Sequence, residues 1–107
     1  MAYYLVQAAY TPEAWAAMAK NPQNRVDAVR PVAERLGGKL EHGWLAFGDY
    51  DIVAILQMPD NASAAAFSIA ASAGGAVKAI KTTPLMTTEE GIAAMKKASA
   101  AGYRPPS

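Results

Sequence analysis

Three side chains near the middle of the sequence, those of His42, Tyr50 and Asp51, could take part in acid–base chemistry. His42 is the only histidine, and imidazole is the one side chain that titrates near neutral pH without help from its surroundings. Beside a substrate it would act as a general base, and Tyr50 or Asp51 would orient the substrate. Tyr50 and Asp51 are neighbours, however, and neighbouring strand residues point to opposite faces. The structural alternative is that His42 is an ordinary strand residue and that the other two hold a turn in shape.

Aromatic residues form a second set of candidates, because they could line a pocket for a planar ligand or belong to an ordinary core or interface. This aromatic set consists of Tyr3, Tyr4, Tyr10, Trp44 and Phe47. Lys81 could meet an anionic substrate, although a lysine on an edge strand also protects that edge from pairing with other chains. The ligand-pocket candidates selected from these residues are Tyr4, Trp44, Phe47 and Lys81.

The composition excludes several kinds of site. The chain has no cysteine, which excludes disulfides, thiolate zinc sites, iron–sulfur clusters and cysteine nucleophiles. One histidine cannot build a histidine-rich metal site within a chain, although copies of His42 could meet at the axis of an oligomer. The sequence contains no nucleotide-binding, metalloprotease or serine-hydrolase motif. We therefore expect no cofactor and no metal.

Charge and hydropathy narrow the choice of partners. The net charge is +1, the pI is about 8.0 and the lysines are scattered, whereas nucleic-acid-binding domains usually have clustered basic residues. The first ten residues read as a strand and lack the basic start of a signal peptide. No apolar run approaches the ~18–20 residues of a membrane span. We expect neither nucleic acid nor a membrane as a partner, and a cytoplasmic location.

The pattern of apolar and turn residues predicts one domain at residues 1–101 and a flexible tail at 102–107. Strands are expected at residues 3–10, 39–47, 50–58 and 76–83. Helices are expected from residue 11 to a break at 21–24, then at about 25–36, 62–73 and 88–100, with caps at Thr11, at Asp60 or Asn61, and at Thr87 or Thr88. This order, β-α-β-β-α-β with a terminal helix, predicts an α+β ferredoxin-like fold with an antiparallel four-stranded sheet.

Residues 39–47 and 50–58 should form a hairpin around Gly48 and Asp49, with Gly48 at positive φ. Strict alternation places His42 on the same face as Leu40 and Trp44. Both faces of the hairpin are then largely apolar, so a sheet face left in water would expose a large apolar patch. A second copy packed sheet to sheet would cover this face, making a homodimer or higher homo-oligomer. The alternative cover is the C-terminal helix.

The turn and its neighbours resemble the GYD domain family over most of the chain, from residue 2 to about residue 90. Its motif corresponds to Gly48, Tyr50 and Asp51 within F-G-D-Y-D-I-V. The supporting segments are G-G-K-L at residues 37–40 and the Pro59-Asp60 start of an alanine-rich helix. The resemblance implies a domain of the dimeric α/β barrel type. The family name describes residues and implies no reaction.

Three functions are consistent with these observations. The first is a homo-oligomeric domain that binds a small molecule between sheet and helices. The second is a small cofactor-independent enzyme of the monooxygenase or isomerase type, which occurs among proteins of similar fold and would need His42, Tyr50 and Asp51 to converge on one pocket. The third is a purely structural assembly protein. The sequence does not decide whether the protein is an enzyme.

Overall fold

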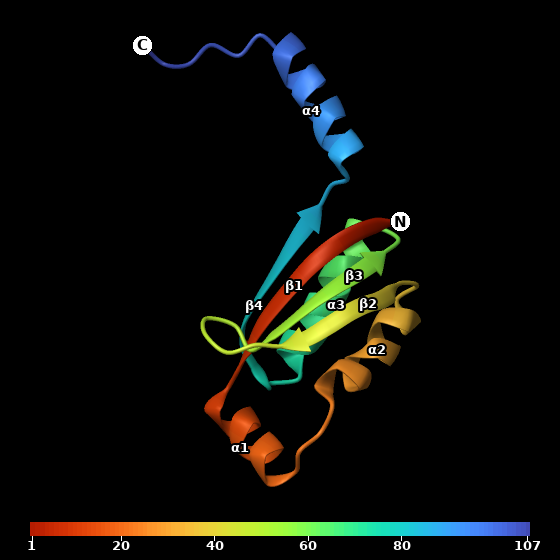
Figure 1. Ribbon diagram of the computed structural model, residues 1–107, viewed down its shortest axis with the longest axis vertical. Helices are drawn as coiled ribbons and strands as arrows, with labels where there is room; N and C mark the ends of the chain where they lie inside the picture. The colour runs from red at the N-terminus through yellow and green to blue at the C-terminus, as the bar shows by residue number, and fades with distance from the viewer.

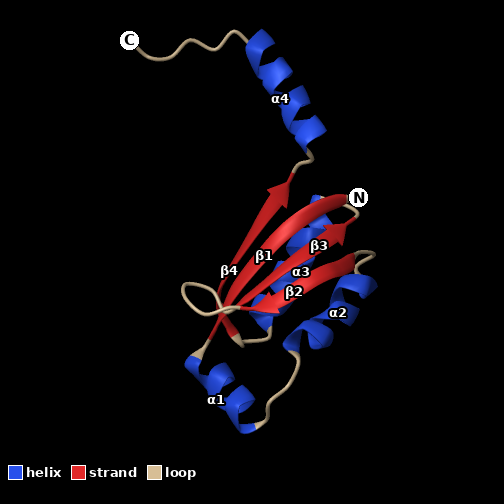
Figure 2. Cartoon of the chain, in the orientation of Figure 1, coloured by secondary structure: helices blue, strands red, loops and turns tan.

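The computed structural model describes all 107 residues and has the α+β, ferredoxin-like fold expected from the sequence. Four strands form one open antiparallel sheet in the order β2-β3-β1-β4 (Figure 2). They are β1 (Ala2–Tyr10), β2 (Lys39–Leu45), β3 (Ile52–Met58) and β4 (Val77–Leu85). The central strands are therefore β3 and β1, and the edge strands are β2 and β4.

The helices are α1 (Pro12–Lys20), α2 (Arg25–Arg35), α3 (Asn61–Ala73) and α4 (Thr88–Ala100). Helices α2 and α3 pack against one face of the sheet, whereas α4 extends away from it (Figure 1). Each helix begins after a side chain that accepts a hydrogen bond from a backbone N–H of the first turn, and these caps are Thr11, Asn24, Asp60 and Thr87. The caps predicted at Thr11, Asp60 and Thr87 are confirmed, and Asn24 adds one within the predicted break.

The hydrophobic core lies between the sheet and the two helices that cover it. Alternate residues of β3, from Ile52 to Met58, are buried, as a period-two pattern predicts. Alternate residues of β1 face the same side, where Ala33 of α2 and Phe67 of α3 meet them. We call this covered side the helix face of the sheet and the other side the open face.

No helix of this chain covers the open face. Helix α4 has no buried residue and extends beyond the end of β4 (Figure 1). The strand register places apolar and polar side chains together on the open face, among them Tyr3, Leu5, Gln7, His42, Trp44, Val53, Ile55, Gln57, Lys81, Thr83 and Leu85. The C-terminal helix is therefore not the cover of this face within one chain.

Strand β2 contains a bulge that corrects the predicted orientation of its residues. Leu40 pairs with Leu56, and the next paired residue is His42, opposite Ile55. The extra residue turns Leu40 to the helix face, whereas His42 and Trp44 lie on the open face. The prediction that Leu40 shares a face with the other two is wrong, because strict alternation assumes an uninterrupted ladder.

Several strand boundaries also differ from those expected. Strand β2 ends at Leu45 and β3 begins at Ile52, so the hairpin loop is longer than the predicted two-residue turn. Gly48 in this loop has φ +141°, the positive value that the turn was expected to need. Strand β4 was expected to stop before Pro84, but it continues through Pro84 and ends at Leu85. A proline, which has no N–H donor, is tolerated there because β4 is an edge strand.

Gly38, the residue before β2, lies too close to β3 to carry a side chain. A Cβ built on it would overlap Met58 Sδ and the carbonyl oxygen of Gln57. Since Met58 is fully buried, Gly38→Ala is expected to lower the free energy of unfolding by about 2 kcal/mol, measured by urea denaturation. Gly74→Ala is the matched control, because Gly74 has φ −70° and a Cβ there would make only ordinary contacts. Equal losses in the two variants would contradict this packing explanation.

Candidate functional site

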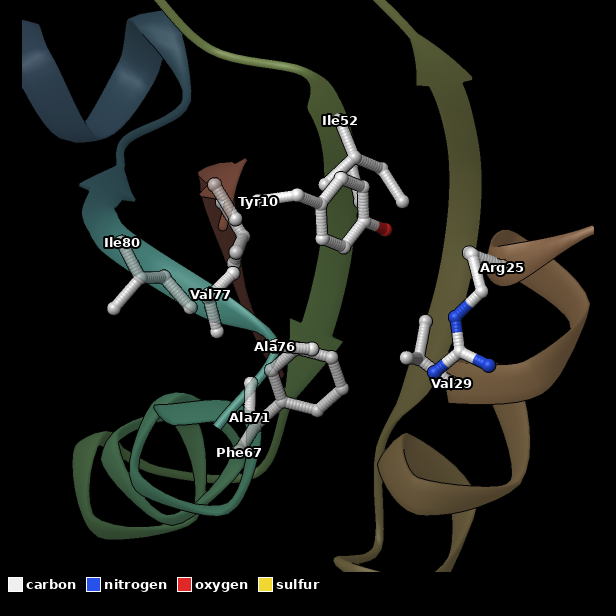
Figure 3. Close-up of a pocket in the computed structure, with 12 residues that line it drawn as sticks. Tyr10, Arg25, Val29, Ile52, Phe67, Ala71, Ala76, Val77 and Ile80 are labelled. Atoms are coloured by element: carbon white, nitrogen blue, oxygen red, sulfur yellow. The ribbon is translucent and has the colours of Figure 1, made fainter. Parts of the chain in front are cut away.

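A cavity of about 100 Å³ lies between the helix face of the sheet and helices α2 and α3. Twelve residues line it; eleven are apolar or aromatic, and the exception is Arg25. Figure 3 shows Phe67 of α3 with Val77 and Ile80 of β4 on one side of the cavity, and Arg25 and Val29 of α2 on the other. The cavity is thus a largely apolar space with one cationic group in its wall.

Small side chains leave this space unfilled. Ala8 of β1 and Ala54 of β3 point to the helix face, and Ala71 of α3 and Ala76, directly before β4, also line the space. Protein interiors are normally packed with few voids larger than a water molecule. The alanine-rich sequence therefore produces a cavity where larger aliphatic residues would have closed the core.

Tyr10 and Arg25 bring polar groups to the apolar wall. The Tyr10 hydroxyl points toward the α2 side, where the Arg25 guanidinium lies (Figure 3). Burial raises the pKa of Tyr10 above its ordinary value, and the nearby Arg25 cation offsets only part of this rise. The phenol therefore stays protonated at neutral pH, so it can donate a hydrogen bond.

Arg25 has no acidic partner in the chain. The two salt bridges join Arg30 to Asp27 and Lys39 to Glu41. The side chain of Arg25 is half-buried, and its Nη1 donates to the neutral Oε1 of Gln23 at 2.9 Å. A guanidinium without a counter-charge therefore borders the cavity.

Asp51 fixes the end of β1 that carries Tyr10. Its Oδ2 accepts hydrogen bonds from the backbone N–H of Tyr10 at 2.9 Å and from Trp15 Nε1 at 3.3 Å. The pairing of β1 with β3 ends at Ala8 and Ile52, so no backbone carbonyl of β3 lies opposite Tyr10. The Asp51 carboxylate takes the place of that carbonyl as the acceptor for the Tyr10 N–H. The Trp15 ring also packs edge-on against Tyr10, with ring centroids 5.4 Å apart.

Comparison with known families finds a match over most of the chain. The model of the family described as GYD domain matches residues 4–95. This protein belongs to the GYD domain family. No curated protein sequence matches the chain.

In this GYD domain, His42 lies apart from Tyr50 and Asp51. His42 is exposed on the open face and stacks on Trp44, with ring centroids 5.6 Å apart. It pairs with Ile55, which is four residues, or roughly 13 Å, along β3 from Asp51. Tyr50 lies in the hairpin loop between β2 and β3. A single chain therefore does not bring the three candidate catalytic residues to one pocket.

The four ligand-pocket candidates lie outside the cavity of the GYD domain. Tyr4 is buried in the core, where its hydroxyl donates to Asn61 Oδ1 at 2.6 Å. Trp44 and His42 border a wide and polar depression of about 610 Å³ between β2 and the start of α2, and Arg25 lines both this depression and the cavity. The Phe47 side chain is 99% exposed in the hairpin loop. Lys81 is exposed on the open face, opposite Gln7.

Sequence reasoning missed Arg25 and Phe67 as cavity residues. A signal for Arg25 does exist, because it is the first residue of a helix, where the helix dipole disfavours a cation. It also stands four residues before Val29, on the side of α2 that faces the sheet. Tyr10 belongs to the aromatic set but not to the ligand-pocket candidates, because only the folded structure shows its hydroxyl pointing toward α2.

Two further features of the structure bear on cofactors and membranes. No three histidine, cysteine, aspartate or glutamate side chains lie together as metal ligands in the chain. None of the helices has the length and the apolar character that crossing a membrane requires.

Proposed function

We propose that this GYD domain is a homodimer that binds a small molecule in the cavity between the sheet and helices α2 and α3. The observation that carries the proposal is the cavity itself, an apolar space bordered by a guanidinium and a phenol. Ligand sites are typically apolar pockets in which a few polar groups fix the orientation of the ligand. The cavity of this chain has that composition.

The open face supports the second part of the proposal, the dimer. It carries Leu5, Val53 and Ile55 at its centre, with Trp44 at one edge. A face of four strands, each about seven residues long, covers roughly 450 Å² as a flat area. Two such faces would bury roughly 900 Å², and the side chains that project from them would add to this area. This area approaches the ~1,000 Å² expected of a specific interface. A second copy is the partner that we propose for this face, because most soluble oligomers are symmetric homo-oligomers.

Native mass spectrometry of the untagged, freshly purified protein tests both parts together, since it reads subunit number and retained mass. A dimer that carries additional mass is expected. A dimer without retained mass would favour a structural assembly protein, and a bare monomer would contradict the dimer. A retained molecule that is chemically changed during incubation would favour the enzyme of the monooxygenase or isomerase type.

A charge placed on the open face tests the interface. Ile55→Lys is expected to convert the dimer to a monomer, because the lysine would be desolvated at the centre of the interface. Sedimentation velocity measures the change, and thermal unfolding checks that the variant is folded. Ser72→Lys is the control, because Ser72 is exposed on α3, away from the sheet. A folded Ile55→Lys variant that remains dimeric would place the interface elsewhere.

A further inference from the structure

We propose that the ligand of this cavity is a small monocarboxylate with a short apolar body, whose carboxylate binds the Arg25 guanidinium beside the Tyr10 hydroxyl. The inference rests on the proposed function, because it names the ligand class of the same cavity. It is carried by three features of the site: an unpaired cation, a phenol that can donate, and a limited volume.

The first feature is the missing counter-charge of Arg25. The carboxylates on nearby elements are engaged elsewhere. Asp27 accepts a hydrogen bond from Asn24 and lies 3.8 Å from Arg30, and Glu41 lies 4.0 Å from Lys39. Asp51 accepts hydrogen bonds from the Tyr10 N–H and the Trp15 indole. A guanidinium presents parallel N–H groups that match the two oxygens of a carboxylate. A bound carboxylate would therefore supply the charge that the chain does not.

The position of Arg25 on α2 supports an anion for a second reason. As the first residue of the helix, Arg25 lies at the positive end of the helix dipole, where its own charge is disfavoured. A bound anion would be stabilised by the guanidinium and by this dipole together. The protonated hydroxyl of Tyr10 can donate to the same carboxylate.

The volume limits the apolar part of the ligand. A dry protein cavity of ~150 Å³ accepts benzene, so the cavity of about 100 Å³ fits roughly four or five carbon atoms. Val29, Ile52 and Phe67 would contact this body. Acetate lacks a body to fill the space, and a fused aromatic ring system exceeds it. Short branched-chain acids fill the space and do not exceed its volume.

Titration of the protein with three small-molecule probes tests the inference. Calorimetry and NMR of the labelled protein measure the binding of each probe. Isovalerate has the charge and the body, isovaleramide has the same shape without the charge, and acetate has the charge without the body. Isovalerate is expected to bind at least about 10-fold more tightly than isovaleramide, because one charged hydrogen-bonded group contributes about that factor. It should exceed acetate by a similar factor, because acetate lacks the apolar carbon atoms that the cavity would bury.

Substitution at Arg25 connects the affinity to this residue. Arg25→Gln is expected to weaken the binding of isovalerate about 10- to 100-fold, to the affinity of isovaleramide. Arg25→Lys should give an intermediate affinity, because lysine keeps the positive charge but lacks the paired N–H donors of a guanidinium. Arg35→Gln is the control, since Arg35 is exposed at the last turn of α2 and does not line the cavity. Circular dichroism checks that each variant is folded.

The outcomes separate this inference from the proposed function. Equal affinity for acid and amide, or unchanged isovalerate affinity in both folded Arg25 variants, would overturn the carboxylate assignment and leave a small-molecule site. If no probe binds while native mass spectrometry finds another retained molecule, only the ligand class is overturned. If no probe binds and nothing is retained, the inference and the proposed binding function fail together.

Discussion

Replacing Asp51 with alanine is expected to lower the free energy of unfolding by about 3 kcal/mol. The carboxylate accepts two hydrogen bonds, from the Tyr10 backbone N–H and from Trp15 Nε1. A hydrogen bond to a charged group contributes ~1.5–3 kcal/mol, and loss of the acceptor leaves the N–H of buried Tyr10 without a partner. Urea denaturation followed by tryptophan fluorescence measures the loss.

Two other variants show whether this loss comes from the carboxylate. Asp51→Asn keeps an acceptor oxygen without the charge, so its loss should be about half as large. Asp49→Ala is the control, because Asp49 is an exposed aspartate of the same loop whose side chain forms no hydrogen bond in the structure. If the Asp49 and Asp51 variants lose equal stability, the loop as a whole, and not the Asp51 carboxylate, holds the end of β1.

The GYD motif has a structural role in this arrangement. Gly48 provides the positive φ of the loop, and the backbone carbonyl and N–H of Asp51 bind the N–H of Ala46 and the carbonyl of Ala8. The side chain of Asp51 then fixes Tyr10, whose ring forms one wall of the cavity. The motif therefore shapes the cavity from outside, because none of its three residues lines it.

The fold could be predicted from the sequence because its signals are local. The alternating residues of β3 and the caps at Thr11, Asp60 and Thr87 each depend on a few neighbouring residues. The bulge in β2 could not be predicted in this way. It depends on which residues of β3 lie opposite, so one extra residue changed the face of Leu40 relative to His42.

The candidate site was harder to predict, because a cavity is a property of packing between elements distant in sequence. Reasoning from residue types favoured His42, the only histidine, and large aromatic residues such as Trp44 and Phe47. The cavity forms instead where small residues such as Ala54 and Ala71 meet. Alanine has no distinctive chemistry, so the sequence gives no direct sign of the space that it leaves.

Filling the cavity separates binding from stability. Ala71→Leu is expected to weaken the binding of isovalerate, or of any molecule retained by the purified protein, by at least about 100-fold. Ala71 lines the cavity from the partly buried side of α3, so a leucine there would place three more carbon atoms in a space of about 100 Å³. The free energy of unfolding should stay the same or rise by about 1 kcal/mol, because cavity filling by a good helix former stabilises a domain.

Ala70→Leu is the matched control for this change. Ala70 is the preceding residue of α3, is exposed and does not line the cavity, so the same substitution there should leave binding within about twofold. Calorimetric titration gives the affinities, and urea denaturation gives the stabilities. Lost binding in the stable Ala71 variant alone would locate the ligand between the sheet and α3. Unchanged binding in both variants would place it outside the cavity, with the wide depression beside His42 and Trp44 as the next site to test.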